Sequence, residues 1–124
     1  EVPTILRRLK ADGARIAILS NGSPEMLAAA VKSAVIEDVI DEVFSVDAIR
    51  RYKSDPDVYD MVTTAWRLYP SAVSFQSSNR WDIAGAKKFG FRTVWINRAG
   101  YPDEYADLPA DAVLANLEGL PAIA

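Results

Sequence analysis

Three short polar segments of this chain each follow an apolar run, and together they carry hydroxyls, amides, one lysine and one aspartate. In parallel α/β sheets, ligands bind at the carboxyl ends of the strands, where turns of this kind meet. We therefore expect the three segments to form one active site. They are Ser20-Asn21-Gly22 after Ile16–Leu19, Tyr52-Lys53 after Val43–Val46, and Ser77-Ser78-Asn79-Arg80-Trp81-Asp82 after Ala72–Gln76.

The 124 residues include no cysteine and no histidine. They can therefore form no disulfide, no thiolate nucleophile and no Cys-type zinc site. They also cannot supply a Ser-His-Asp triad or an imidazole base. A general base in this chain should be Asp, Glu or Lys, and a metal would need oxygen ligands. The chemistry that these residues offer is that of carboxylates.

Composition and charge narrow the range of partners. The chain is 50% hydrophobic, with 14 basic and 17 acidic residues and a net charge of −3. Such a charge balance is not typical of a protein that binds nucleic acid. No apolar run approaches the roughly 18–20 residues of a membrane span, and no signal-peptide pattern opens the chain. We expect a cytoplasmic protein whose partners include neither nucleic acid nor a membrane.

Strand-like and helix-like patterns alternate along the chain. This alternation favours an α/β fold, a Rossmann-like parallel sheet with helices on both faces, built as one domain over residues 1–124. The second helix is expected to bury Leu27, Ala30, Val31 and Ala34, which share one face. The expected strands are 15–20, 43–46, 72–76, 93–96 and 112–114; the expected helices are 1–12, 24–34, 56–68, 81–89 and 117–123, with one helical turn at 47–52.

The three polar segments resemble, in order and spacing, the second, third and fourth motifs of the haloacid dehalogenase superfamily. The matching stretches are Leu19 to Gly22, Tyr52 to Pro56 and Ser77 to Asp82. The segment Phe91–Gly100 adds a likeness to the L-2-haloacid dehalogenases in particular. The resemblance implies the C-terminal part of that family's core domain. It begins after the family's first strand, which ends in the nucleophilic aspartate, and after its helical cap. In the family's sheet, that strand lies between the strands that end here at Ser20 and Gln76.

The resemblance implies that four residues of this chain bind the substrate. Ser20 would bind the substrate carboxylate, and Asn21 would help to cradle the departing halide. A helix amino terminus follows both residues, and its free N–H groups favour anions. Tyr59 matches an active-site tyrosine of the family, and the alternative is a packed or surface tyrosine. Trp81 would be a wall of the pocket, and the alternative is a core residue.

The resemblance also implies catalytic roles. Lys53 would position the nucleophilic aspartate, because a nearby cation favours the ionised carboxylate. Asp82, together with Asn79 and Ser77, would orient and activate the water that hydrolyses an aspartyl ester. The family usually has proline after this lysine, whereas this chain has Ser54. Losing that proline loosens the turn that presents Lys53.

Ser78 separates two reactions within the superfamily. Its phosphatases usually carry Asp at this position, four residues before the equivalent of Asp82, and use both carboxylates to hold magnesium. A hydroxyl removes one formal charge from such a site, and hard cations prefer anionic oxygen. A dehalogenase needs no metal. The sequence therefore favours a site without a metal or other cofactor.

The implied reaction is hydrolysis of a short (S)-2-haloacid to the (R)-2-hydroxyacid through an aspartyl ester, in a homodimeric enzyme. The runner-up is a magnesium-dependent phosphomonoesterase of the same superfamily. A third possibility is that the chain is a non-catalytic α/β fragment that binds a partner. Because the chain lacks the expected nucleophile strand, we expect the 124 residues alone to be inactive.

Overall fold

The computed structural model describes residues 1–45, 55–103, 105 and 107–123. Helices and strands alternate through most of this length, as the sequence predicts. Within the described ranges, no helix is both long enough and apolar enough to cross a membrane. The helices are α1 (Val2–Ala11), α2 (Pro24–Ser33), α3 (Pro56–Trp66) and α4 (Arg80–Phe89), and the strands are β1 (Ala17–Ser20), β2 (Glu42–Ser45), β3 (Ser74–Ser77), β4 (Arg92–Ile96) and β5 (Ala112–Leu114).

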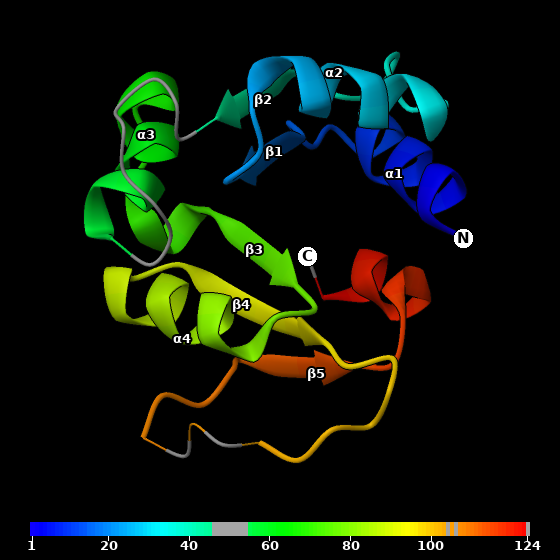
Figure 1. The fold of residues 1–124 in the computed structure, drawn as a ribbon. Helices are drawn as coiled ribbons and strands as arrows, with labels where there is room; N and C mark the ends of the chain where they lie inside the picture. Colours follow the sequence, from blue (N-terminus) through cyan, green and yellow to red (C-terminus); the bar gives the residue numbers. More distant parts are fainter. Residues whose placement is uncertain (46–54, 104, 106, 124) are drawn as a thin grey trace.

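The strands are all parallel to their neighbours but form two separate sheets. One sheet has the order β1-β2, and the other has the order β3-β4-β5. In Figure 1 the two sheets lie one above the other, with β1 and β3 on the sides that face each other. The register pairs Ser20 with Ser45 and Ser77 with Trp95. The carboxyl ends of β1 and β2 therefore lie level, and that of β3 lies one residue short of that of β4.

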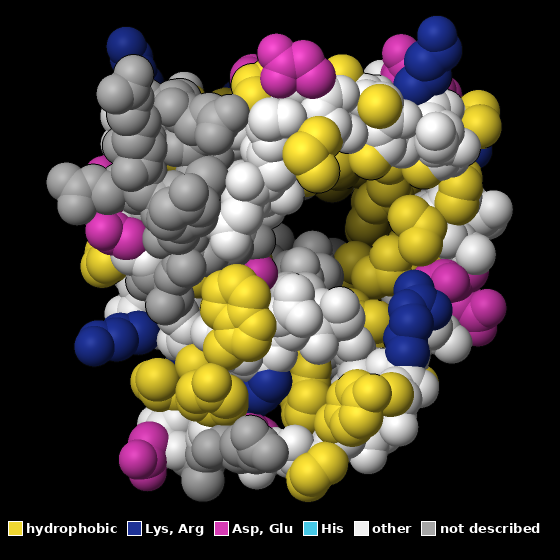
Figure 2. All heavy atoms as spheres, in the orientation of Figure 1, with side chains coloured by type: hydrophobic (Ala, Val, Ile, Leu, Met, Phe, Trp, Pro, Cys, Tyr) yellow, Lys and Arg dark blue, Asp and Glu magenta, His cyan; other side chains and the backbone are white. Residues whose placement is uncertain are grey.

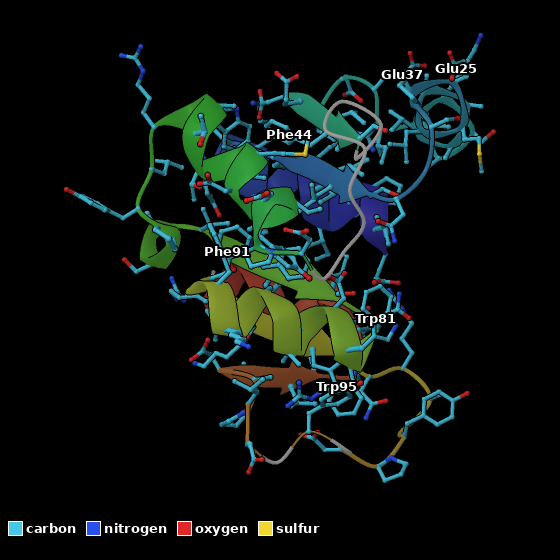
Figure 3. All side chains as sticks on the ribbon, turned by 60° about the vertical axis from the view of Figure 1, so that its left-hand side comes forward. Glu25, Glu37, Phe44, Trp81, Phe91 and Trp95 are labelled. Carbon is cyan, nitrogen blue, oxygen red and sulfur yellow. The ribbon has the colours of Figure 1, made fainter. Side chains whose placement is uncertain are left out.

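Helix α3 joins the two sheets through one hydrophobic cluster. Tyr59 and Val62 of α3 pack in this cluster with Phe44 of the first sheet and Phe91, which precedes β4. Figure 3 shows α3 between the labels of Phe44 and Phe91. The ring of Tyr59 meets that of Phe91 edge-on, with the centroids 5.8 Å apart. This shared core fixes one sheet relative to the other on the α3 side.

A second connection lies on the opposite side, where α1 contacts the 3₁₀ segment η3 (Leu117–Ala122) (Figure 1). Arg98 donates to both carboxylate oxygens of Glu1, at 3.0 and 2.7 Å. The backbone N–H of Leu117 donates to the same carboxylate at 3.2 Å. The guanidinium of Arg98 and this N–H lower the pKa of Glu1 to about 2. We call Glu1, Arg98 and Leu117 the Glu1 clasp.

The edge strands of both sheets are fixed by the same device. In each sheet, an aspartate lies just before the last strand, β2 or β5. Its carboxylate accepts a backbone N–H from the neighbouring strand or from the residue before it, and forms an ion pair with a lysine of a helix. The lysine and this N–H hold the pKa of each aspartate below its usual value. The two sets are Lys10, Asp41 and Ile16 in the first sheet, and Lys87, Asp111 and Thr93 in the second.

Several sequence predictions are corrected by the structure. Ala30 and Ala34 are exposed, because only Leu27 and Val31 of α2 face the sheet. Residues 70–72 form a 3₁₀ turn that delays β3 to Ser74, so Ser77 ends the strand and does not follow it. The last helix, expected at 117–123, is present as a 3₁₀ helix over Leu117–Ala122 that contains Pro121. The helical turn expected at 47–52 lies outside the described residues.

Helix ends place two ordinary residues in the left-handed conformation that favours glycine. Val35 follows α2 with a φ of 56°, and Arg67 follows α3 with a φ of 53°. Gly90 takes this place after α4, with a φ of 119°, and a Cβ there would lie 3.1 Å from Pro70. The backbone at Val35 is strained, because β-branched residues rarely adopt this conformation.

Candidate active site

A cleft of about 770 Å³ separates the two sheets. The facing strands β1 and β3 line its length, and Val62, Trp66 and Phe91 contribute apolar walls. Figure 2 shows the opening in the middle of the molecule, with hydrophobic side chains along part of its wall. At the carboxyl ends of the two strands, the lining is polar. Its residues there are Ser20, Ser77, Ser78, Asn79 and Asp82, and we call this end the mouth.

Ser20 forms one side of the mouth. Its Oγ accepts the backbone N–H of Gly22 at 3.1 Å, so the hydroxyl keeps its hydrogen for donation elsewhere. A Cβ on Gly22 would lie 3.2 Å from Leu27 and 3.5 Å from this Oγ, which leaves little room for a larger residue. Helix α2 begins just beyond, capped by Ser23, whose Oγ accepts the N–H of Met26.

The second side of the mouth repeats this arrangement. Ser77 accepts the backbone N–H of Asn79 at 3.1 Å through its Oγ. Asn79 precedes α4, but its side chain does not cap the helix. The side-chain amide is therefore available at the mouth. Asp82 lies in the first turn of α4, where the helix dipole favours a negative charge.

Asp82 is 2% exposed, and it contacts the buried side chain of Tyr59. The Tyr59 hydroxyl donates to Oδ1 of Asp82 at 2.8 Å, and it also lies 3.3 Å from the backbone oxygen of Asp82. Burial first, and then the carboxylate of Asp82, raise the pKa of Tyr59 far above its usual value. The tyrosine thus remains a hydrogen-bond donor. This contact fixes the orientation of the carboxylate.

The structure brings together four of the eight predicted site residues, namely Ser20, Ser77, Asn79 and Asp82. Tyr59 is fully buried, and its hydroxyl contacts Asp82, so contact with substrate stays a prediction. The same holds for two exposed residues. Asn21 lies on the turn after β1, and Trp81, 41% exposed, lies at the start of α4 (Figure 3). Lys53 lies outside the described residues.

Sequence reasoning missed three residues that hold the mouth in place. Ser45 and Trp95 each donate to a carbonyl of one of the two turns. Arg80, 8% exposed, donates through Nη2 to the carbonyl of Tyr105 at 2.9 Å and to that of Leu108. It thereby anchors the long loop after β4 beside the start of α4. No local signal in the sequence marks the first two, because they are recognised only from the strand register that pairs them with Ser20 and Ser77.

Known proteins match this chain over most of its length. A family model described as haloacid dehalogenase-like hydrolase matches residues 1–90. (S)-2-haloacid dehalogenase 1 of Pseudomonas sp. (strain CBS-3) is 47% identical over 116 residues, which cover 94% of this chain and 51% of that protein. The (S)-2-haloacid dehalogenase of Pseudomonas sp. (strain YL) is 50% identical over 100 residues, which cover 81% of this chain and 43% of that protein.

The fold matches as well. The structure of L-2-haloacid dehalogenase from Xanthobacter autotrophicus with chloropropionic acid covalently bound has a TM-score of 0.87 and 34% identity; the match covers 98% of this chain and 58% of that one. This chain spans about half the length of the curated relatives it matches. The predicted α/β class and the resemblance are thus confirmed, and the chain belongs to the haloacid dehalogenase-like hydrolase family.

Proposed function

We propose that this chain forms the C-terminal part of the catalytic core domain of a hydrolytic (S)-2-haloacid dehalogenase, about half of the complete enzyme. The observation that carries the proposal is the mouth, where three serine side chains, an asparagine amide and a buried carboxylate meet at the end of an open cleft. Two relatives that are 47% and 50% identical are (S)-2-haloacid dehalogenases. The mouth offers hydrogen-bond donors for an anionic substrate and a base for water.

The cleft supports the proposal that residues outside this chain supply part of the active site. The facing edges of β1 and β3 each span four residues, a length that one further strand could match. A strand placed there would pair with both sheets and end at the mouth. We propose that its last residue is the nucleophilic aspartate. Lys53, outside the described residues, would hold that carboxylate ionised.

The first step would take place at C2 of the haloacid. A carboxylate oxygen of the nucleophile attacks C2 from the face opposite the halogen, and the carbon–halogen bond breaks. The halide leaves with the bonding electron pair, and an ester forms. The hydroxyl of Ser20 would hold the substrate carboxylate by donating its hydrogen. Attack from the opposite face inverts the configuration at C2.

The second step would take place at the ester carbonyl. Asp82 takes a proton from a water molecule that Asn79 and Ser77 orient, and the water oxygen attacks the carbonyl carbon. The acyl carbon–oxygen bond then breaks, and the departing alkoxide oxygen takes the proton that Asp82 holds, which frees the 2-hydroxyacid. The second water proton passes to solvent, which restores the nucleophile as a carboxylate. C2 is untouched in this step. The net result is one inversion, from (S)-substrate to (R)-product.

A single turnover in ¹⁸O-labelled water tests this route in the complete protein. With enzyme in excess over (S)-2-chloropropionate, the product hydroxyl oxygen should come from the nucleophile, so the lactate should be unlabelled and the protein labelled. Labelled lactate would show that water attacks C2 directly, with Asp82 as its base. The (R)-substrate is the matched control and should release no halide.

A chelator separates this proposal from phosphatase chemistry. Halide release should continue in EDTA, because the position of Ser78 offers a hydroxyl where the superfamily's phosphatases usually have a carboxylate. Activity on a phosphate monoester that needs added magnesium, without halide release, would overturn the proposal. We also propose a cytoplasmic homodimer. Light scattering of the complete protein should give twice the mass of one chain.

A further inference from the structure

The two turns at the mouth are built on one plan. Each strand that lines the cleft ends in a serine whose Oγ accepts the N–H two residues on, from Gly22 in the first turn and from Asn79 in the second. The two hydrogen bonds have the same length, 3.1 Å. Each such bond occupies the serine oxygen as an acceptor and leaves its hydrogen to donate.

The neighbouring strand completes each turn from the same register position. Ser45, the partner of Ser20, donates its Oγ–H to the carbonyl of Gly22 at 2.7 Å. Trp95, the partner of Ser77, donates its indole N–H to the carbonyl of Ser78 at 3.1 Å. Both donors are buried, with exposures of 8% and 4%. Two different side chains thus fill one structural role.

We propose that Ser45 and Trp95 are positioning residues for the two sides of the active site; this inference rests on the proposed function. The peptide groups of each turn are held by the strand-end serine and by the donor from the neighbouring strand. Removing the donor leaves a turn carbonyl without this partner. The serine hydroxyl then loses its fixed direction, and a misplacement of about 1 Å can cost a hundredfold in rate.

The two sides should respond differently, because they serve different steps. Ser45 orients the turn that binds the substrate carboxylate through Ser20, so Ser45→Ala should raise KM roughly tenfold with little change in kcat. Trp95 orients the turn that holds water through Ser77 and Asn79. Trp95→Phe, which replaces the indole with a smaller aromatic ring that has no N–H, should lower kcat of the complete protein roughly tenfold with little change in KM.

Thr63→Val is the matched control. Thr63 is 7% exposed, and its Oγ1 donates to Asp60, with Oδ1 of that residue at 2.5 Å and its backbone carbonyl oxygen at 3.2 Å. It lies on α3 and is not among the residues that line the cleft. The Thr63→Val variant should lower the unfolding midpoint in urea about as much as Ser45→Ala does, while leaving KM and kcat within twofold of the unaltered protein. Ser45→Thr keeps the hydroxyl and should restore KM. The proposal would be overturned if Thr63→Val raised KM as much as Ser45→Ala, or if Ser45→Ala left KM unchanged.

Amide hydrogen exchange tests the same inference without any substrate. Ser45→Ala should speed exchange of the Gly22 N–H roughly tenfold and leave that of Asn79 unchanged, while Trp95→Phe should do the reverse. Unchanged exchange at both amides would refute positioning. If the unaltered protein releases no halide but the exchange results hold, the proposed function fails and the positioning roles stand.

Discussion

The hydrogen bond between Tyr59 and Asp82 can be tested with the loss of a single oxygen. Tyr59→Phe keeps the ring among Phe75, Phe89 and Phe91, so the hydrophobic packing is retained. A hydrogen bond to a charged group contributes about 1.5–3 kcal/mol. With a urea m-value of about 2 kcal/mol per molar, a loss near 2 kcal/mol lowers the unfolding midpoint by about 1 M.

Urea unfolding followed by tryptophan fluorescence measures this change. Tyr69→Phe is the matched control, since Tyr69 is 84% exposed, and its midpoint should move by less than about 0.25 M, the half kilocalorie typical of surface changes. The wild type should also lose stability above about pH 10, because unfolded Tyr59 ionises there while the folded residue, with its raised pKa, stays protonated. Tyr59→Phe should remove this part of the alkaline loss. A Tyr59→Phe midpoint equal to that of Tyr69→Phe would show that the contact contributes nothing.

Three further predictions concern separate parts of the chain. Val35→Gly should raise the free energy of unfolding by about 1 kcal/mol, because Val35 is 68% exposed and has a left-handed φ; Val113→Gly, an exposed valine in β5, should lower it in the same urea titration. The lowered pKa of Glu1 means that its clasp stabilises the fold above about pH 4.5 and is lost as the pH falls toward about 2. Glu1→Gln should therefore flatten the stability loss between pH 5 and pH 3, and an unchanged slope would rule the clasp out as its source. Asp82→Asn in the complete protein should release about one equivalent of halide and then stall with a substrate adduct on the protein, seen by mass spectrometry; unchanged turnover would remove Asp82 from the mechanism.

The order of elements was predictable because each carries a local signal. Asp55 and Ser23 cap helices that begin with proline, and Gly90 ends α4 in the left-handed conformation. These signals act within a few residues of the chain. They predict where helices begin and end, but not which face of a helix is buried. The exposed alanines of α2 show this, because alanine fits either face, and only the packing decides which one is buried.

The site was predictable at the level of strand ends but not of supporting contacts. Ser20, Ser77 and Asp82 follow apolar runs, so their meeting at one edge follows from a parallel sheet. The contact between Tyr59 and Asp82 joins residues on two helices, and the pair depends on how α3 crosses α4. The donors Ser45 and Trp95 depend on register between strands. Only the folded chain fixes such pairings.

The two sides of the mouth are held apart by structures that do not cross the cleft. Helix α3 and the Glu1 clasp set the spacing of the sheets, while Ser45 and Trp95 fix each turn within its own sheet. A strand that entered between β1 and β3 would find both edges already spaced and both turns already oriented. Most of the ordering cost of the site would then be met before the strand binds, which favours tight association. Binding to the folded chain alone would also stabilise it by mass action. In the proposed enzyme, completing the sheet and completing the active site are therefore the same event.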